Sequence, residues 1–230
     1  MRSGATSIAD DGTGHRARLR LRLFDGGPKA LLDHELVEYL LALAIPRRDT
    51  KAQAKKLIAE FGGIGPLLSA DSETLSRAGL SANVVAALKI AEATALRLLE
   101  TRIEGRPLLS NWEALGDYLQ AAMAHTAVEE VRVLFLNAKN LLIANEAMWQ
   151  GSVDEASVHV REVISRAIAL GATAIIIVHN HPSGDSTPST QDIRLTRNLV
   201  DAGKHMKITV HDHVIVGSQG RTSLKALGLI

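Results

Sequence analysis

The chain has 230 residues, a formal net charge of +1 and no cysteine, so its length allows one large domain or two small ones. The absence of cysteine excludes disulfides and thiolate metal ligands, and the near-neutral charge gives no overall attraction to nucleic acid or membranes. No stretch approaches the ~20 apolar residues of a membrane span, and no apolar segment opens the chain as in a secretory signal, so we expect a cytoplasmic protein.

The first part of the chain is predicted to be a flexible tail followed by an all-helical domain. Residues 1–17 are rich in glycine, serine, threonine and aspartate, which predicts a flexible segment. Helical spacing of apolar residues then predicts a helical domain over 18–102, and the break in this spacing at 101–107 is interpreted as a linker. A basic stripe is interpreted as a solvated arm, with phosphate contact as the alternative; it consists of Arg16, Arg18, Arg20 and Arg22.

After the linker, helical and extended patterns alternate along the chain. This order predicts an α/β domain over residues 108–230, with a mixed sheet and helices on its faces. The expected elements are a helix at about 111–125, strands at 131–137 and 141–148, a helix at 160–170, a strand at 173–179, a helix at 189–205 and C-terminal strands.

The third of these strands leads into a cluster of metal-binding residue types. Residues 172–178 are apolar and rich in β-branched side chains, which is typical of a buried strand. His179 and His181 follow, and residues i and i+2 of a strand point to the same face. Pro182 begins a turn, after which Asp192 lies in the first turn of the expected helix. Two imidazoles and one carboxylate, with one position open, are the ligand set of a catalytic zinc ion.

The same residues also allow a purely structural interpretation. Ser189 and Asp192 fit an N-terminal capping box, with serine at the cap and an acid three residues later. A pair of histidines at the end of a strand can also be hydrogen-bonded surface groups. The combination of all four residues at this spacing favours the metal site, and Ser189 can act both as a cap and in the site.

These residues also give the chain a resemblance to a known family. The spacing of His179, His181, Ser189 and Asp192 is that of the JAMM motif of the JAB/MPN metalloprotease superfamily. The heptapeptide HNHPSGD at this place resembles the bacterial RadC branch, and the resemblance covers about residues 16–230. It implies a JAB/MPN domain, similar in fold to cytidine deaminases, preceded by a small all-α domain that resembles a helix-hairpin-helix module. Further segments similar to RadC are VRVLFLN from Val131, LLIANE from Leu141, REVI from Arg161 and VHDHVIVG from Val210.

The resemblance further implies a catalytic glutamate upstream of the histidines, at the end of an early strand. Glu146 occupies that place in the RadC-like segment and is therefore expected to be the catalytic acid and base. By residue type alone, Asp154, Glu155 and Glu162 are alternatives. The first two lie in an expected loop, and the helical phase of Glu162 indicates exposure to solvent.

Together these residues imply metal-assisted hydrolysis of an amide bond in a protein or peptide. Zn²⁺ held by His179, His181 and Asp192 would activate a water molecule. Glu146 would take up its proton and later deliver it to the leaving amine. Ser189 would donate a hydrogen bond to the developing oxyanion. This set predicts a zinc metallopeptidase of the JAMM type.

A second His-x-His pair lies in an alternating segment near the C-terminus. No Asp or Glu follows Asp212, so no downstream carboxylate can complete a ligand set with His211 and His213. We interpret both histidines as structural or supporting residues, with Asp212 as a carboxylate that could orient a ligand imidazole. Asp185 is interpreted as a turn residue at the rim of the site, although its type makes it a rival of Asp192.

DNA binding is the alternative function. The helix-hairpin-helix module that the resemblance implies presents backbone amides to DNA phosphates without reading sequence. The best match is the turn at Gly79, Leu80 and Ser81, which lacks the second glycine of such hairpins, and Ala78 replaces the usual basic residue. These departures weaken the case for phosphate contact. Weak DNA binding through the helical domain therefore stays the alternative, in a DNA-associated protein of repair or recombination whose metal is not catalytic.

Overall fold

The computed structural model describes residues 13–151 and 159–230, and the chain divides into two compact units. The division falls inside one long helix, between Ala93 and Thr94. Residues 1–12, most of the expected flexible tail, lie outside the described residues. Among the residues that are described, no helix is both long and apolar enough to cross a membrane.

The N-terminal unit is all-helical, which confirms the predicted class of this region. Its elements are α1 (Thr13–Gly26), the 3₁₀ helix η1 (Pro28–Ala30), α2 (Asp33–Ala44), α3 (Lys51–Phe61), α4 (Ile64–Ser69), α5 (Ser72–Arg77) and the first part of α6 (Ala82–Glu100). Apolar residues at helical spacing on α2, α3 and α6 face one core, in which Leu41, Leu57 and Leu88 are buried.

The turn between α5 and α6 is the place of the expected hairpin. Gly79 has a φ of 82°, a left-handed conformation that favours glycine. The Leu80 amide donates to the Leu75 carbonyl, which closes the end of α5. A tight turn between the two helices therefore forms with a single glycine.

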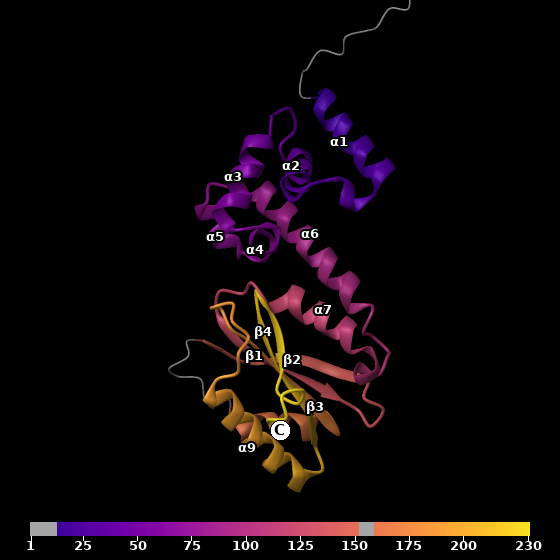
Figure 1. Ribbon diagram of the computed structural model, residues 1–230, viewed down its shortest axis with the longest axis vertical. Helices are drawn as coiled ribbons and strands as arrows, with labels where there is room; N and C mark the ends of the chain where they lie inside the picture. Colours follow the sequence, from indigo (N-terminus) through magenta and orange to yellow (C-terminus); the bar gives the residue numbers. More distant parts are fainter. Residues whose placement is uncertain (1–12, 152–158) are drawn as a thin grey trace, which may run out of the picture. The chain divides into compact units, whose positions relative to one another are not determined.

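The C-terminal unit is an α/β domain built around a five-stranded mixed sheet (Figure 1). After α6 its elements are the 3₁₀ helix η2 (Leu108–Asn111), α7 (Trp112–Met123), β1 (Glu129–Leu136), β2 (Leu142–Gly151), α8 (Val160–Ala169), β3 (Ala174–Asn180), α9 (Thr190–Met206), β4 (Thr209–Gly217) and β5 (Gly220–Ser223). The strand order is β2-β1-β3-β4-β5, in which β3 and β4 pair in parallel and the other described neighbours are antiparallel. Because parallel neighbours need a crossover, α9 connects β3 to β4. The predicted α/β class with a mixed sheet is confirmed.

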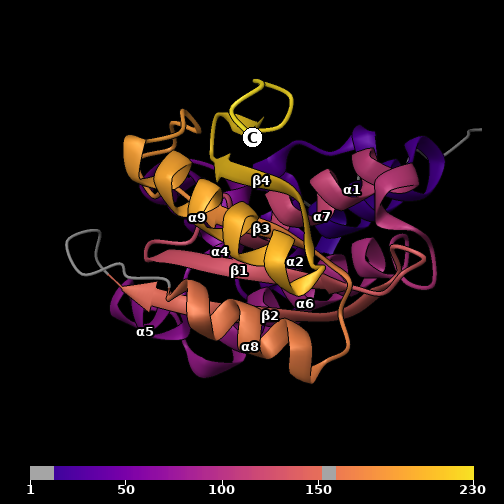
Figure 2. The same cartoon turned by 90° about the horizontal axis from the view of Figure 1, so that it is seen from below.

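Helices cover both faces of this sheet (Figure 2). α8 and α9 lie side by side on one face, over a core that includes Val133 and Ile177. α7 packs on the other face, over a core that includes Leu134 and Ile176. Alternate residues of β1 and β3 thus point into opposite cores, which is why 133–136 of β1 and 174–178 of β3 are continuous apolar runs in the sequence. The face under α8 and α9 also carries His179, two residues after Ile177.

Candidate metal centre

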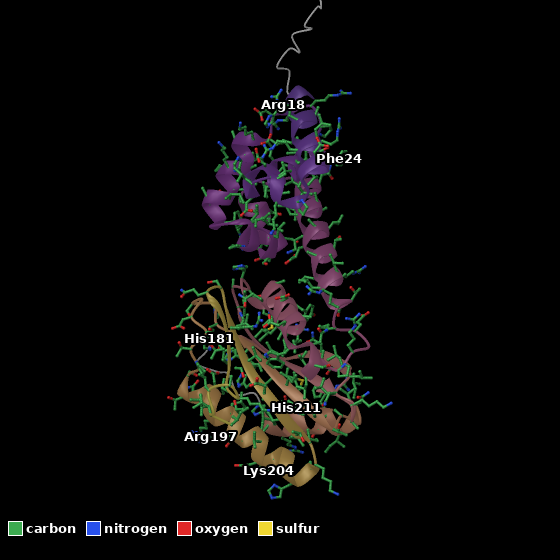
Figure 3. The ribbon with its side chains drawn as sticks, turned by 45° about the vertical axis from the view of Figure 1, so that its right-hand side comes forward. Arg18, Phe24, His181, Arg197, Lys204 and His211 are labelled. Carbon is green, nitrogen blue, oxygen red and sulfur yellow. The ribbon has the colours of Figure 1, made fainter. Side chains whose placement is uncertain are left out.

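The end of β3 and the first turn of α9 form the candidate metal centre. His179 is the second-last residue of β3. His181 comes directly after the strand and lies at the end of the sheet, as Figure 3 shows. Pro182 then starts the turn that leads toward α9. The ring centroids of His179 and His181 are 4.9 Å apart. The structure therefore brings the expected histidine pair together.

Both ring nitrogens of His179 contact carboxylates. Nδ1 lies 2.9 Å from Asp192 Oδ1, and Nε2 makes a short contact with Glu129 Oε1. The exposed fractions of His179, Asp192 and Glu129 are 6%, 4% and 7%. Buried carboxylates are costly unless they are paired with positive charge. This arrangement therefore requires a proton or a metal cation between the two acids.

Asp192 is held in place by the start of α9. Ser189 is the N-cap residue: its Oγ accepts from the Asp192 amide at 3.1 Å, and its own amide donates to Asp192 Oδ2 at 2.7 Å. The Ser189 hydroxyl also donates to Asp192 Oδ2, at 2.6 Å. Burial opposes ionisation of Asp192, but hydrogen bonds from His179, His181 and Ser189 outweigh it and hold the pKa of Asp192 well below its usual range. Asp192 is therefore an anionic donor at neutral pH.

His181 presents one nitrogen to the centre and uses the other for a backbone contact. Its Nδ1 donates to the Asp185 carbonyl at 2.8 Å, and its Nε2 lies 3.4 Å from Asp192 Oδ2. The interaction with Asp192 raises the pKa of His181. The carboxylate of Asp185 accepts from the amide and hydroxyl of Thr187, which is turn chemistry. Asp185 thus stabilises the turn and orients the His181 ring.

Glu146, the expected catalytic acid, is not brought to this cluster. It lies on the edge strand β2, where Arg166 of α8 binds both of its carboxylate oxygens, at 2.7 and 2.6 Å. The hydrogen bonds from Arg166 lower the pKa of Glu146. Of the alternative acids, Glu162 is exposed on α8, and Asp154 and Glu155 lie outside the described residues.

Glu129 is a carboxylate of the candidate centre that the sequence analysis did not identify. It is the first residue of β1, and Val131, two residues later, pairs with His179 of β3. Glu129 and Val131 share a face of the sheet, so the acid reaches the centre from the neighbouring strand. Its Oε2 is buried and has no hydrogen-bond partner among the described residues. A pattern in the sequence could have indicated it: Glu129, Val131 and Val133 alternate along the strand. This alternation places the acid on the same face as the two buried valines.

The second histidine pair is split between two locations. His211 contacts Asn140 Oδ1 through Nε2 at 2.7 Å, toward the opposite end of the sheet from His181 (Figure 3). His213 is completely buried and offers one ligand atom within 4.8 Å of those of His179 and Asp192. Burial lowers the pKa of His213 to about 3, so its ring is neutral. The structure thus adds His213 to the cluster, where the sequence predicted a supporting role.

Asp212 points to the other face of the sheet. It accepts hydrogen bonds from the Ser223 hydroxyl, the Lys225 amide and the adjacent His213 amide. These contacts fix β5 and the turn after it to β4. Among the described residues, Asp212 therefore binds two backbone amides and the Ser223 hydroxyl. The contact with a ligand imidazole that the sequence suggested is not formed there.

The donors at this centre suit a divalent transition-metal ion. Two overlapping groups of side chains in the described part of the chain could hold one: Glu129, His179 and His181, and His179, Asp192 and His213. Imidazole nitrogens and carboxylate oxygens are the usual ligands of Zn²⁺ and of other first-row ions. Two buried carboxylates, one with an unpartnered oxygen, also provide the negative charge that such a cation neutralises.

Comparison with known proteins adds to this geometry. The profile of one protein family, described as RadC-like JAB domain, matches residues 109–229, which include every residue of the centre. A UPF0758 protein of Rhodobacter capsulatus is 46% identical over 213 residues, which covers 92% of this chain and 100% of that protein. The similarity therefore extends over both units of the chain.

Proposed function

The chain belongs to the RadC family of JAB-domain proteins, and from this premise we propose that it is a metal-dependent hydrolase. Its reaction is the hydrolysis of an amide bond, peptide or isopeptide, in a protein or peptide substrate. The observation that carries the proposal is the buried cluster in which His179 lies between the carboxylates of Glu129 and Asp192, with His181 beside it.

Zn²⁺ is the proposed ion, held by His179, His181 and Asp192. Two imidazoles and one carboxylate leave a position open, as catalytic zinc sites do. When bound, the ion acts as a Lewis acid on the scissile carbonyl and on the attacking water. The Ser189 cap and the Asp185 carbonyl keep Asp192 and His181 in place for this role.

Glu129 is the residue that we propose moves the proton. Its Oε1 faces His179, and its Oε2 is buried without a hydrogen-bond partner among the described residues. The free oxygen can accept a proton from the attacking water and deliver it to the leaving nitrogen, which is the role expected of Glu146 from the sequence. Glu146 is bound on both oxygens by Arg166 and serves to tie β2 to α8.

Ser189 is the proposed donor to the oxyanion. Its hydroxyl donates to Asp192 Oδ2 in this structure. The hydroxyl hydrogen therefore lies at the centre, where it can be donated to an oxyanion instead. A redirected hydrogen bond to the developing negative charge would contribute about 3 kcal/mol to transition-state stabilisation. The helix cap depends on a different hydrogen bond, in which Ser189 Oγ accepts from the Asp192 amide. Redirecting the hydroxyl hydrogen leaves that bond in place.

The test of this proposal is a cleavage assay with a mixture of peptides and isopeptide-linked peptides, read by mass spectrometry. Zinc-loaded protein should release new termini, a chelator should abolish the release, and added zinc should restore it. The Asp192→Ala variant should be inactive, while Asp201→Ala, which removes an exposed acid of the same helix, should retain activity. Cleavage that continues in the presence of a chelator, or none by protein shown to hold metal, would contradict the proposal.

A second candidate function is contact of the N-terminal unit with DNA phosphates. Between α2 and the middle of α3 lies a cluster of exposed basic residues: Arg47, Arg48, Lys51, Lys55 and Lys56. Such a cluster gives binding that depends on salt and little on base sequence. Replacing Lys55 and Lys56 by Glu should weaken binding to a duplex in an anisotropy titration at low salt. Lys139→Glu in the other unit is the control, and equal binding by all three proteins would argue against this role.

A further inference from the structure

A bulge in β4 aims His213 at the metal centre. The register between β3 and β4 skips His211, which is the extra residue of the bulge. Beyond it, His213 pairs with Ile177, two residues before His179, so the His213 and His179 side chains share the face under α9. Their rings are nearly parallel, at an interplanar angle of 20°, with centroids 6.1 Å apart. The bulge thus separates the two histidines of the pair and directs one of them to His179.

The hydrogen bonds of His213 determine which ring nitrogen carries the proton. The Thr196 hydroxyl donates to the Asp192 carbonyl at 2.5 Å, one helical turn earlier. A hydroxyl has one hydrogen, so its oxygen, 2.6 Å from His213 Nδ1, must accept from that nitrogen. Nδ1 therefore carries a hydrogen, and Nε2 is the ring nitrogen left to offer a lone pair within this completely buried side chain.

That lone pair has no partner in the described part of the chain. His213 Nε2 is buried and forms no hydrogen bond there, which is rare for a polar atom in a protein interior. Two members of the metal centre lie close to this ring: His213, His179 and Asp192 each offer one ligand atom, and these atoms lie within 4.8 Å of one another. A buried imidazole lone pair beside an anionic carboxylate is a donor suited to a transition-metal ion.

We propose that His213 is a further ligand of the metal centre and coordinates the ion through Nε2, together with His179 and Asp192. This inference rests on the proposed metal-dependent function and goes beyond it, because His213 lies outside the His179, His181 and Asp192 motif. With four protein ligands, the attacking water would take a fifth position at the ion. A third imidazole favours zinc and other late first-row ions over Mg²⁺ and Ca²⁺. Thr196 is a positioning residue, because its hydroxyl fixes the proton on Nδ1.

The direct test is nuclear magnetic resonance of the full chain with ¹⁵N-labelled histidine and ¹¹³Cd²⁺ in place of zinc. A one-bond coupling between ¹⁵N and ¹¹³Cd appears only on a nitrogen that binds the ion. We expect this coupling on Nε2 of His213, and one coupled nitrogen each in His179 and His181. The His213→Gln variant assigns the signal by its loss, and His211→Gln is the matched control that retains it. If His213→Gln does not fold, single replacements of the other histidines assign the His213 signal by elimination.

The outcomes separate this inference from the proposed function. Couplings at His179 and His181 without one at His213 would overturn the inference and leave the metal-dependent function in place. The absence of coupling at all three histidines would overturn both.

A second measurement tests the positioning role of Thr196. Thr196→Val removes the hydroxyl at nearly constant volume, and Thr196→Ser retains it. Loss of a residue that orients a ligand typically weakens metal binding by about 10- to 100-fold. We therefore expect such a rise in the zinc Kd for the valine variant, by competition with a chelating dye, and a Kd near wild type for the serine variant. Equal Kd values for the two variants would contradict the role of Thr196.

Discussion

His179 joins the two carboxylates of the centre, and each of them reaches it from a different element. Asp192 comes from the first turn of α9, and Glu129 comes from the start of β1. The histidines and Asp192 could be identified from the sequence because strand alternation and a capped helix restrict where they point. Glu129 could not be chosen over Glu146 in the same way. Both acids precede β3, and the sequence does not reveal that the strand of Glu129, and not that of Glu146, pairs with β3.

Replacement of the two candidate acids distinguishes their roles. Glu129→Gln should lower kcat by about 10²- to 10⁴-fold, because it removes the group that we propose transfers the proton. Glu146→Gln should leave kcat close to wild type, since this side chain is bound to Arg166. Steady-state kinetics on a cleavable peptide, with zinc content measured in parallel, provides the comparison. The opposite pattern would assign the proton transfer to Glu146.

The ion pair between Glu146 and Arg166 has its own pH dependence. Because the hydrogen bonds from Arg166 lower the folded-state pKa of Glu146, the pair stabilises the fold at pH values above the ordinary pKa of 4.5, and this contribution is lost as pH falls through the lowered pKa. The Tm difference between wild type and Glu146→Gln should therefore be constant near neutral pH and shrink in acid. A difference that grows on acidification would refute this assignment.

Among the helices and strands, the sequence predicted the type and limits of the elements better than the register between strands. The helices expected at 160–170 and 189–205 appear as α8 and α9 with limits that differ by one residue, because each has a clear apolar stripe. The bulge at His211 was not foreseen, and without it the pair at His211 and His213 would point to one face. A bulge depends on how neighbouring strands pair, which alternation within one strand does not encode.

The loop that carries His181 is packed tightly against the end of β4. A Cβ atom at Gly217 would lie 2.3 Å from the Gly184 carbonyl oxygen, which neither backbone can easily avoid. Gly217→Ala should therefore destabilise the fold by about 1–3 kcal/mol, and it should weaken zinc binding by displacing the loop. Denaturant unfolding and a zinc titration measure the two effects.

Gly105→Ala is the control for this change. Gly105 has a φ of 64° and open space around its Cβ position, so alanine there adds only backbone strain. That strain is about 1–2 kcal/mol, and it should leave the zinc Kd unchanged. Zinc affinity that is unaffected by Gly217→Ala would show that the loop contact does not position His181.

The whole chain combines two units with separate cores, and all of the candidate metal ligands lie in the second. The α/β class of the second unit and the helical class of the first were predictable, because apolar periodicity changes between them. The substrate-binding surface was not predictable, since no residue pattern in the sequence marks it.

Zinc should therefore stabilise the two units unequally. An ion that binds only the folded state stabilises it by about 4 kcal/mol at 1,000 times its Kd. Hydrogen exchange with and without zinc should show added protection in β1, β3 and α9, and no change in α2 and α3. Added protection in the N-terminal unit alone would place the metal elsewhere.

Binding of a metal ion between the end of β3 and the start of α9 can be measured by elemental analysis. Purified wild-type protein, resupplied with zinc and dialysed, should retain about one ion per chain. His179→Ala and Asp192→Ala should lose it, and His211→Ala should retain it, because His211 contacts Asn140 at the other end of the sheet. Retention of the ion by both His179→Ala and Asp192→Ala, or no ion in the wild type, would show that these residues do not form a metal site.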